Sequence, residues 1–167
     1  MALRVGGAEL SNFSPRMVGA AWRKFWSLEP PARRILRRAF TAVGVCRVAL
    51  WFLPFRTLRG AVDWASGILP EDKSGCAKPE EIAWAVRVAG DYVPKSSCLV
   101  QALAAQFLLT RSGLPGCVRI GVAFNDQREF QAHAWVESDG TVLIGGNDST
   151  GRYTPLLAWE GRRNGQS

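Results

Sequence analysis

Apolar residues recur at helical spacing through the first two thirds of the chain, with i, i+3 and i+4 neighbours on one side. Prolines divide this part, because proline is well tolerated in the first turn of a helix but not in its interior. The pattern predicts a short helix after Pro15 and four further helices, over residues 32–53, 55–64, 79–90 and 98–112. Gly90 and Gly113 are the expected stops of the last two helices.

The last third of the chain reads as β-structure. An apolar run at 117–124 and an alternating run at 130–137 flank a turn at 125–129, and a Ser-Asp-Gly turn leads to a strand at 141–144. In the alternating run, successive side chains point to opposite faces. The two faces are Gln131, His133, Trp135, Glu137 and Phe130, Ala132, Ala134, Val136. The second, more apolar set is the expected core side, and helices followed by antiparallel strands predict an α+β fold.

Charge is distributed unevenly over this pattern. The net charge is +7, and residues 1–69 hold 11 Lys/Arg against 3 Asp/Glu, whereas residues 70–167 hold 10 against 11. Residues 67–79 are rich in Gly and Pro, so we expect a linker there. We therefore divide the chain into a basic helical extension, 1–69, and a second domain, 70–167. No nucleic-acid-binding motif or aromatic platform accompanies the basic residues, so we expect no nucleic-acid partner.

The most apolar helical segment, 39–53, is about 15 residues long and contains Arg47, whereas a membrane span needs roughly 20 residues with few charges. We interpret it as a helix buried in the core or covered by a partner, with membrane-surface contact as the lesser alternative. The first residues lack the pattern of a signal peptide. The expected location is the cytoplasm, with free thiols.

The chain has four cysteines and one histidine that could bind a metal or act in catalysis. Cys46, Cys76, Cys98 and Cys117 show no Cys-x-x-Cys spacing, and His133 is the single histidine, so we expect neither a metal site nor another cofactor. Cys46 and Cys117 lie among apolar residues and are expected to be buried, while Cys76 is the expected exposed thiol of a loop.

Cys98 differs from the other thiols because it opens a helix. Ser97 is a suitable N-cap, and the positive end of a helix and a neighbouring imidazolium both favour the thiolate that acts as nucleophile. His133 supplies the imidazole if its strand packs against that helix end. Alone, each residue also has a structural interpretation, as a small buried thiol and as a solvated side chain.

A third residue should accept the other N–H of the imidazole. Glu137 is about 13 Å along the same strand and Asp139 occupies the turn, so neither fits. Folding the hairpin at the turn places residues 145–146 roughly opposite His133, which leaves Asn147 and Asp148. We prefer Asp148, because a carboxylate stabilises an imidazolium better than an amide does.

These segments together resemble a known family. The resemblance covers roughly residues 22–157. Its motifs are residues 97–103 (Ser-Cys-Leu-Val-Gln-Ala-Leu), 111–115, 119–122, 132–137 (Ala-His-Ala-Trp-Val-Glu), 139–140 and 144–146, with upstream matches at 28–36 and 48–56. In this order they are similar to the lasso-peptide biosynthesis leader peptidases, a branch of the transglutaminase-like cysteine-protease superfamily.

The resemblance implies a transglutaminase-like or papain-like core, in which the helix that opens with the cysteine packs on an antiparallel sheet, preceded by a helical extension. It implies a cysteine peptidase that removes the leader from a ribosomally made lasso-peptide precursor before a separate ATP-dependent cyclase closes the macrolactam. Cys98 carries over as nucleophile and His133 as general base. The acidic third residue does not map cleanly, and its slot falls at residues 145–148.

The resemblance also implies partners. Only about 20 residues precede the shared region, so we expect the split type, which works with a small separate leader-recognition protein. We expect residues 15–65 to dock that partner or the leader, with Trp22, Trp26, Trp51 and Phe55 as apolar anchors. A helical cover for the catalytic core is the alternative role.

Three competing interpretations remain open at this stage. A transglutaminase or acyltransferase would use the same residues with an amine in place of water. A catalytically dead transglutaminase-like fold would act as a binding module. A basic adaptor on a membrane surface is the weakest of the three.

Overall fold

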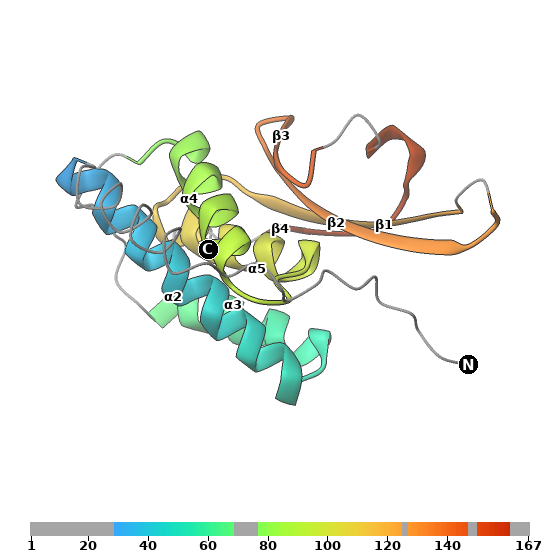
Figure 1. The fold of residues 1–167 in the computed structure, drawn as a ribbon, viewed down its shortest axis with the longest axis horizontal. Coiled ribbons are helices and arrows are strands. Elements are labelled where there is room, and N and C mark those ends of the chain that lie inside the picture. The colour runs from blue at the N-terminus through green and yellow to red at the C-terminus, as the bar shows by residue number, and fades with distance from the viewer. Residues whose placement is uncertain (1–28, 69–76, 125–126, 147–149, 161–167) are drawn as a thin grey trace, which may run out of the picture.

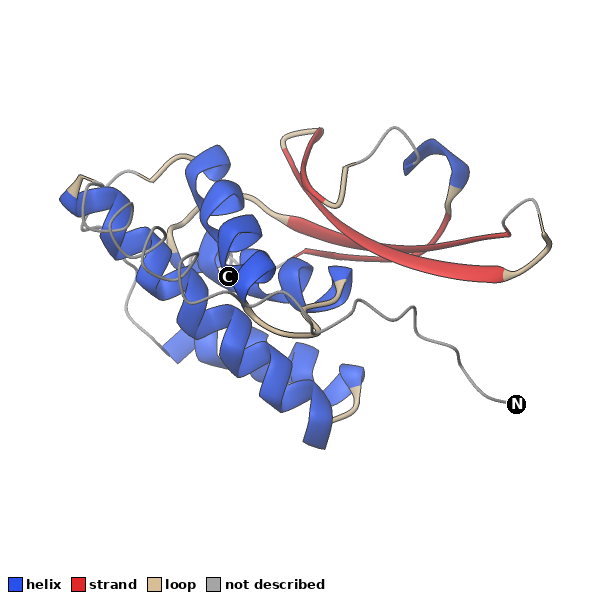
Figure 2. Cartoon of the chain, viewed as in Figure 1, coloured by secondary structure: helices blue, strands red, loops and turns tan. Residues whose placement is uncertain are grey.

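The computed structural model describes residues 29–68, 77–124, 127–146 and 150–160. Within these residues, four α-helices precede a four-stranded antiparallel sheet, so the predicted α+β class is confirmed. Figure 1 shows the helices gathered at one end of the molecule and the sheet extending from them, and Figure 2 colours the same view by element type. The elements are α2 (Pro30–Phe52), α3 (Phe55–Ile68), α4 (Pro79–Tyr92), α5 (Cys98–Arg111), β1 (Cys117–Phe124), β2 (Phe130–Ser138), β3 (Thr141–Ile144), η1 (Thr150–Arg152) and β4 (Thr154–Glu160).

All four helices begin or end close to where the sequence predicts. Pro30 and Pro31 open α2, and Pro79 opens α4 with Glu80 and Glu81 in its first turn, where carboxylates suit the helix dipole. At Gly113, φ is +69°, which is the left-handed conformation that ends α5 as predicted.

The predicted stop at Gly90 is wrong, since α4 continues to Tyr92. A Cβ at Gly90 would lie 2.5 Å from Nε2 of Gln101, so the glycine lets α5 approach α4 closely. The residue thus serves packing and does not end the helix. Helix α3 is likewise longer than predicted and runs to Ile68.

The helices share one core with the sheet. Leu36, Ala39, Val43 and Cys46 of α2 are buried, and α2 packs against both α4 and α5. Helix α5 packs against β2. In the middle of α5, Gln106 is fully buried and its Nε2 donates to the carbonyl oxygen of Gly116, 2.9 Å away, just before β1. The basic helices therefore contribute core side chains as well as surface charge.

The sheet has the strand order β3-β2-β1-β4. Strands β2 and β3 are joined by the two-residue turn Asp139-Gly140, with φ of 47° and 78°, as the Asp-Gly pair predicts. In the β1–β2 pair, Gly121 lies opposite His133 and Arg119 opposite Trp135. Strand β4 pairs with the other edge of β1.

The alternation predicted for β2 holds in its second half and fails in its first. Ala134 and Val136 lie in the core, but Ala132 and Phe130 are exposed, Phe130 to 64%, so the predicted place of these two residues on the core side is wrong. The reason is that the β1–β2 hairpin extends beyond the helices, and near its tip the ring of Phe130 packs on that of Phe124, edge to face and 6.0 Å apart.

Several predictions fall on residues outside the described ranges. These are the short helix after Pro15, the exposed thiol Cys76, and the domain boundary at 69/70 with most of its linker. In the part of the chain that the structure describes, none of the helices combines the length and the apolar character that a membrane crossing needs.

Candidate active site

Cys98 is the first residue of α5, as predicted. The Oγ of Ser97 accepts from the backbone N–H of Val100 at 3.4 Å, and the backbone oxygen of Ser97 accepts from Gln101 N–H at 3.1 Å. The Cys98 side chain is half-buried and packs against the edge of the core. A thiol in this position lies at the positive end of the helix dipole.

Gln101 does not turn back towards Cys98. Its side chain lies against Gly90 of α4, where α4 and α5 cross. The groups near Cys98 that could stabilise a developing oxyanion are therefore backbone N–H groups. Within the described structure, Val100 and Gln101 N–H are bonded to Ser97, whereas no hydrogen bond engages Cys98 N–H.

His133 is half-buried near the middle of β2, and its ring orientation is fixed by a backbone carbonyl. Its Nε2 lies 2.8 Å from the carbonyl oxygen of Gly145, just after β3. Because a carbonyl oxygen can only accept, Nε2 carries the proton and donates it to this bond. In the neutral imidazole, Nδ1 is then left with the lone pair, which is the nitrogen that can take a proton from a nucleophile.

Gly145 is suited to this contact because it has no side chain. Its φ is +75°, and a Cβ would lie 2.7 Å from the Ala134 carbonyl oxygen and 3.1 Å from His133 Nε2. The sequence argument placed residues 145–146 opposite His133, and the structure confirms this for Gly145.

Two aromatic rings flank the imidazole. The ring of Trp135 lies 6.2 Å from that of His133 in a stacked arrangement, and the ring of Tyr153 lies 5.2 Å away. Trp135 is buried, and Tyr153 lies on the same side of β2, since both approach Gly121. A Cβ at Gly121 would meet both the Trp135 ring and Tyr153 at 3.0 Å, so a glycine is needed beneath them.

A polar network continues from this ring cluster. Nε1 of Trp135 donates to Glu137 at 2.8 Å, and Arg119 Nε donates to the other carboxylate oxygen of Glu137 at 2.6 Å. The hydrogen bond to Glu137 and its charge raise the pKa of Arg119. Glu137 thus accepts hydrogen bonds from both the Trp135 indole and the Arg119 guanidinium. The indole that it holds packs beside His133.

The structure brings the two elements of the predicted pair together without joining the two side chains. Helix α5 packs against β2, but between Cys98 Sγ and the His133 ring, both of them described, there is no hydrogen bond. Asp148 and the alternative Asn147 lie outside the described residues. The assignment of Cys98, His133 and Asp148 as a catalytic set therefore stays a prediction.

The comparison with protein families decides the chain's membership. Residues 40–158, from within α2 to within β4, match the profile of the Transglutaminase-like superfamily. The chain belongs to this superfamily. Neither the comparison with curated proteins nor the one with solved structures gives a match.

Transglutaminase-like proteins are often cysteine-dependent enzymes, which agrees with a helix that opens with a cysteine. The matched region includes both Cys98 and His133. Membership therefore supports a cysteine protease or an acyltransferase as the class of activity.

The other described thiols have different environments. Cys46 is buried as predicted, and burial raises the pKa of its thiol to about 11. Cys117 is half-buried, and burial is the main cause that raises its pKa too. Both are therefore weaker candidates for a thiolate nucleophile at neutral pH. The described residues hold no group of three or more His, Cys, Asp or Glu side chains placed to bind a metal ion.

The carbonyl of Gly145 and the ring of Tyr153 were not among the predicted site residues. The positive φ of Gly145 had a sequence signal, since a Gly-Gly pair directly follows an apolar strand. Tyr153 had none, because its contact depends on how the chain returns from β3 to β4.

Proposed function

We propose that this transglutaminase-like protein is a cysteine peptidase that removes the leader from a ribosomally made lasso-peptide precursor before a separate ATP-dependent cyclase forms the macrolactam. Superfamily membership and the motif order around Cys98 and His133 support the proposal. The observation that carries it is the bond from His133 Nε2 to Gly145, because it leaves Nδ1 as the basic nitrogen on the strand next to the cysteine helix.

In the proposed reaction, His133 Nδ1 takes the proton of Cys98 Sγ, and the thiolate attacks the scissile carbonyl carbon. The oxyanion of the tetrahedral intermediate accepts from Cys98 N–H, which no group in the described structure engages. The C–N bond then breaks, and the imidazolium gives its proton to the leaving amine. Water, deprotonated by His133, cleaves the thioester and releases the leader's C-terminal carboxylate.

During each transfer the positive imidazolium is stabilised by the Gly145 carbonyl, whose oxygen accepts from Nε2–H throughout. Asp148, three residues further on, is the proposed acidic member of the site. Its carboxylate would stabilise the same imidazolium.

The decisive test is mass spectrometry of a cognate precursor incubated with the protein, with and without the separate leader-recognition protein. We expect two free peptide ends from wild type, none from Cys98→Ala or His133→Ala, and undiminished cleavage by Cys117→Ser, which changes a thiol outside the proposed site. Cleavage at full rate by Cys98→Ala would refute the proposal. Transfer of the acyl group to an amine, without hydrolysis, would identify an acyltransferase instead.

Thiol reactivity separates an active site from a catalytically dead binding module. We expect iodoacetamide at pH 6 to alkylate Cys98 first. Cys46 is the internal reference, because its pKa of about 11 makes its thiolate roughly a hundredfold scarcer than that of an unperturbed thiol with a pKa of 9.0. If Cys98 is alkylated no faster than Cys117, the site is not activated and the binding-module interpretation holds.

The N-terminal helices are proposed to dock the leader or its recognition protein. Trp51 is 70% exposed and Arg47 lies over its ring, so Trp51 is available as an anchor, whereas Phe55 packs against the core. Trp22 and Trp26 lie outside the described residues. Because α2 is part of the core, the test is Trp51→Ala in a pull-down, and not deletion of the helices. Undiminished capture of the recognition protein by Trp51→Ala would exclude this anchor.

A further inference from the structure

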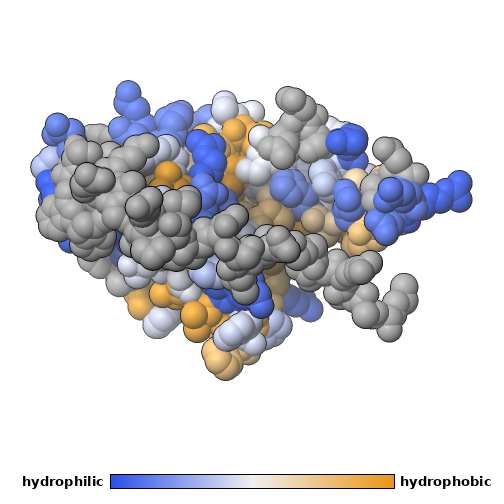
Figure 3. All heavy atoms as spheres, in the orientation of Figure 1, coloured by the Kyte–Doolittle hydropathy of each residue, from blue (hydrophilic) through white to orange (hydrophobic). Residues whose placement is uncertain are grey.

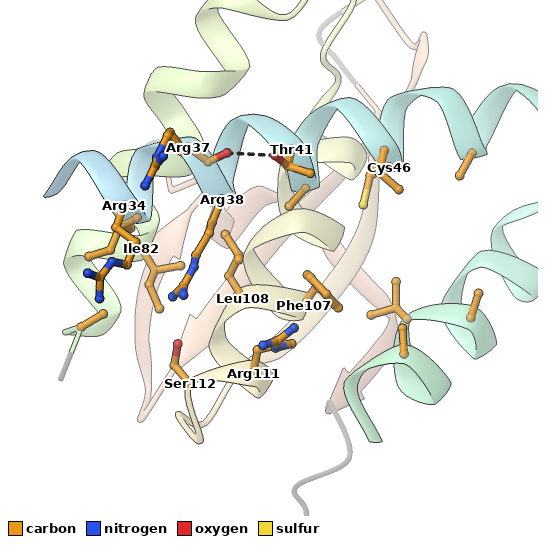
Figure 4. Close-up of a pocket in the computed structure, with 18 of the residues that line it drawn as sticks. Arg34, Arg37, Arg38, Thr41, Cys46, Ile82, Phe107, Leu108, Arg111 and Ser112 are labelled. Carbon is orange, nitrogen blue, oxygen red and sulfur yellow. Dashed lines mark hydrogen bonds between the residues drawn. The ribbon is translucent and has the colours of Figure 1, made fainter. Parts of the chain in front are cut away.

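A pocket of about 1400 Å³ lies among α2, α3 and α5, and His133 is not one of the residues that line it. Figure 4 shows lining side chains of this pocket, such as Cys46, Phe107 and Leu108, that extend from the helices. On the face that Figure 3 shows, hydrophobic atoms gather over α2 and α3, whereas the outer end of the sheet is mainly hydrophilic. The surroundings of the imidazole are therefore set by the strands and their connections, and not by the helical pocket.

The hydrogen bond to Gly145 leaves one degree of freedom of the imidazole open. The atom that it holds is Nε2, which lies 2.8 Å from the Gly145 carbonyl oxygen. Nε2 is on the far side of the ring, close to the line that extends the Cβ–Cγ bond of His133. Rotation about Cβ–Cγ therefore moves Nε2 little but changes the direction of Nδ1, and the energy profile of this rotation is broad in histidine. A second contact is needed to set the plane of the ring.

Tyr153 provides such a contact. Its ring centroid lies 5.2 Å from that of His133, with 33° between the planes, and is nearer than the indole of Trp135 at 6.2 Å. Both distances are within the roughly 4.5–7 Å at which aromatic rings attract each other. Gly121 is the residue opposite His133 in the β1–β2 pair, and a Cβ there would lie 3.0 Å from the Tyr153 Cβ. The glycine thus leaves room for the tyrosine beside the imidazole.

The side chain of Tyr153 is not part of what holds the sheet together. Tyr153 is half-buried and lies between η1 and β4, and the pairing of β4 with β1 begins one residue later, at Thr154. The hydrophobic core of the described residues includes Ala134 and Val136 of β2 but not Tyr153. The ring partner of Tyr153 in the described structure is the imidazole. Its contact with His133 is therefore not a by-product of core packing.

We infer that Tyr153 is a positioning residue, whose ring fixes the rotation of the His133 imidazole about Cβ–Cγ and with it the direction of Nδ1. The inference rests on the proposed function, in which Nδ1 takes the proton of Cys98. The face of a phenol ring also attracts a positive charge within about 6 Å of its centre, so Tyr153 stabilises the imidazolium that this transfer forms. Tyr153 acts through His133 and does not itself touch the reacting atoms.

The first test is the mobility of the imidazole in the full chain, measured by NMR. His133 is the single histidine of the sequence, so its Cε1–Hε1 signal is assigned directly when the affinity tag contains no histidine. We expect the order parameter of this bond to fall from about 0.85, typical of a rigid group, to below about 0.6 in Tyr153→Leu. Tyr153→Phe keeps the ring and should keep the wild-type value.

The matched control is Tyr92→Leu, the same change at the second tyrosine of the chain. Tyr92 packs on Phe40 of α2 with ring centroids 6.1 Å apart, and its replacement should leave the His133 signal as in wild type. Gly121→Ala disturbs the contact without removing the ring, because the new Cβ would lie 3.0 Å from the Tyr153 Cβ and must displace it slightly. We expect it to loosen the imidazole less than Tyr153→Leu does.

The second test is cleavage of the precursor by the same variants. We expect Tyr153→Leu to lower kcat at least about tenfold with KM unchanged, because a misdirected catalytic group weakens the transition state and not the binding of substrate. Tyr153→Phe should restore kcat, and Tyr92→Leu should cleave as wild type does.

Three outcomes overturn the inference: an unchanged order parameter in Tyr153→Leu, an equal fall in Tyr92→Leu, or an equal fall in Tyr153→Phe, which would assign the effect to the hydroxyl. Thermal melts monitored by circular dichroism show which variants are folded, and if Tyr153→Leu is not, the order parameter and kcat of Gly121→Ala decide. If wild type does not cleave the precursor, the proposed function fails, whereas the NMR comparison still shows whether Tyr153 restrains the imidazole.

Discussion

Two regions of the sheet are built by different means. In the region covered by the helices, Val118, Ala134, Val136 and Trp159 are buried among aliphatic side chains of α2 to α5. Around His133, the rings of Trp135 and Tyr153 lie beside the imidazole, and positions are fixed by hydrogen bonds and by glycines. The first region is specified by burial and the second by contacts between particular atoms.

This difference indicates where the sheet tolerates change. A buried aliphatic position can lose a methyl group at a cost to stability alone, because the neighbours relax around it. A position that orients an imidazole loses its function with a displacement of about 1 Å, even when the fold survives. Variants in the two regions should therefore separate stability from reactivity.

The largest effect is expected from Gly145→Ala. The new Cβ would lie 2.7 Å from the Ala134 carbonyl oxygen and 3.1 Å from His133 Nε2, so the backbone must shift and the bond from the imidazole to the Gly145 carbonyl is disturbed. We expect a loss of about a hundredfold or more in kcat/KM for precursor cleavage. Gly140→Ala is the control, because Gly140 shares the positive φ of 78° but nothing lies within 4 Å of its Cβ position. Equal losses in the two variants would show that backbone strain, and not the imidazole contact, is responsible.

A smaller effect, on stability and not on activity, is expected from Val136→Ala in the region covered by the helices. Val136 is fully buried, and the cavity should lower the free energy of unfolding by about 2 kcal/mol, measured by urea denaturation. Well below the unfolding transition, kcat/KM and the rate of Cys98 alkylation should equal those of wild type. A selective fall in either rate would show that the two regions are not independent.

The smallest effect is expected from Glu137→Gln. This change removes the charge that pairs with Arg119 but keeps an acceptor for the Trp135 indole. Because both side chains of the ion pair are partly exposed, we expect a loss of less than about 1 kcal/mol in unfolding free energy. Glu137→Ala, which also removes the acceptor, should cost more and should lower kcat slightly by loosening the indole beside His133. If Glu137→Gln is as damaging as Glu137→Ala, the charge itself is what holds the network.

The sequence was sufficient for features set by local chemistry. The Ser97 cap, the Gly113 stop and the Asp139-Gly140 turn each depend on a few adjacent residues, and each is confirmed. The bounds of β1 and β3 are also as predicted. Alternation in β2 identified Ala134 and Val136 as core positions.

Features that depend on distant segments could not be predicted. Gly90 has the composition of a helix stop, and only the crossing of α4 with α5 reveals its packing role. Phe130 has the composition of a core residue, but the hairpin carries it beyond the helices. In the site, the contact of Tyr153 with His133 requires the path from β3 through η1 to β4.

The buried side-chain amide of Gln106 fixes the rotation of α5 about its own axis. An all-aliphatic helix could turn about its axis with modest repacking, but a turn here would break the hydrogen bond from Gln106 Nε2 to the Gly116 carbonyl oxygen, which links α5 to the start of β1. Cys98 lies about two turns away on the same helix, so the rotation that Gln106 holds also sets the direction of the Cys98 side chain. A single polar side chain in the core thus orients the proposed nucleophile.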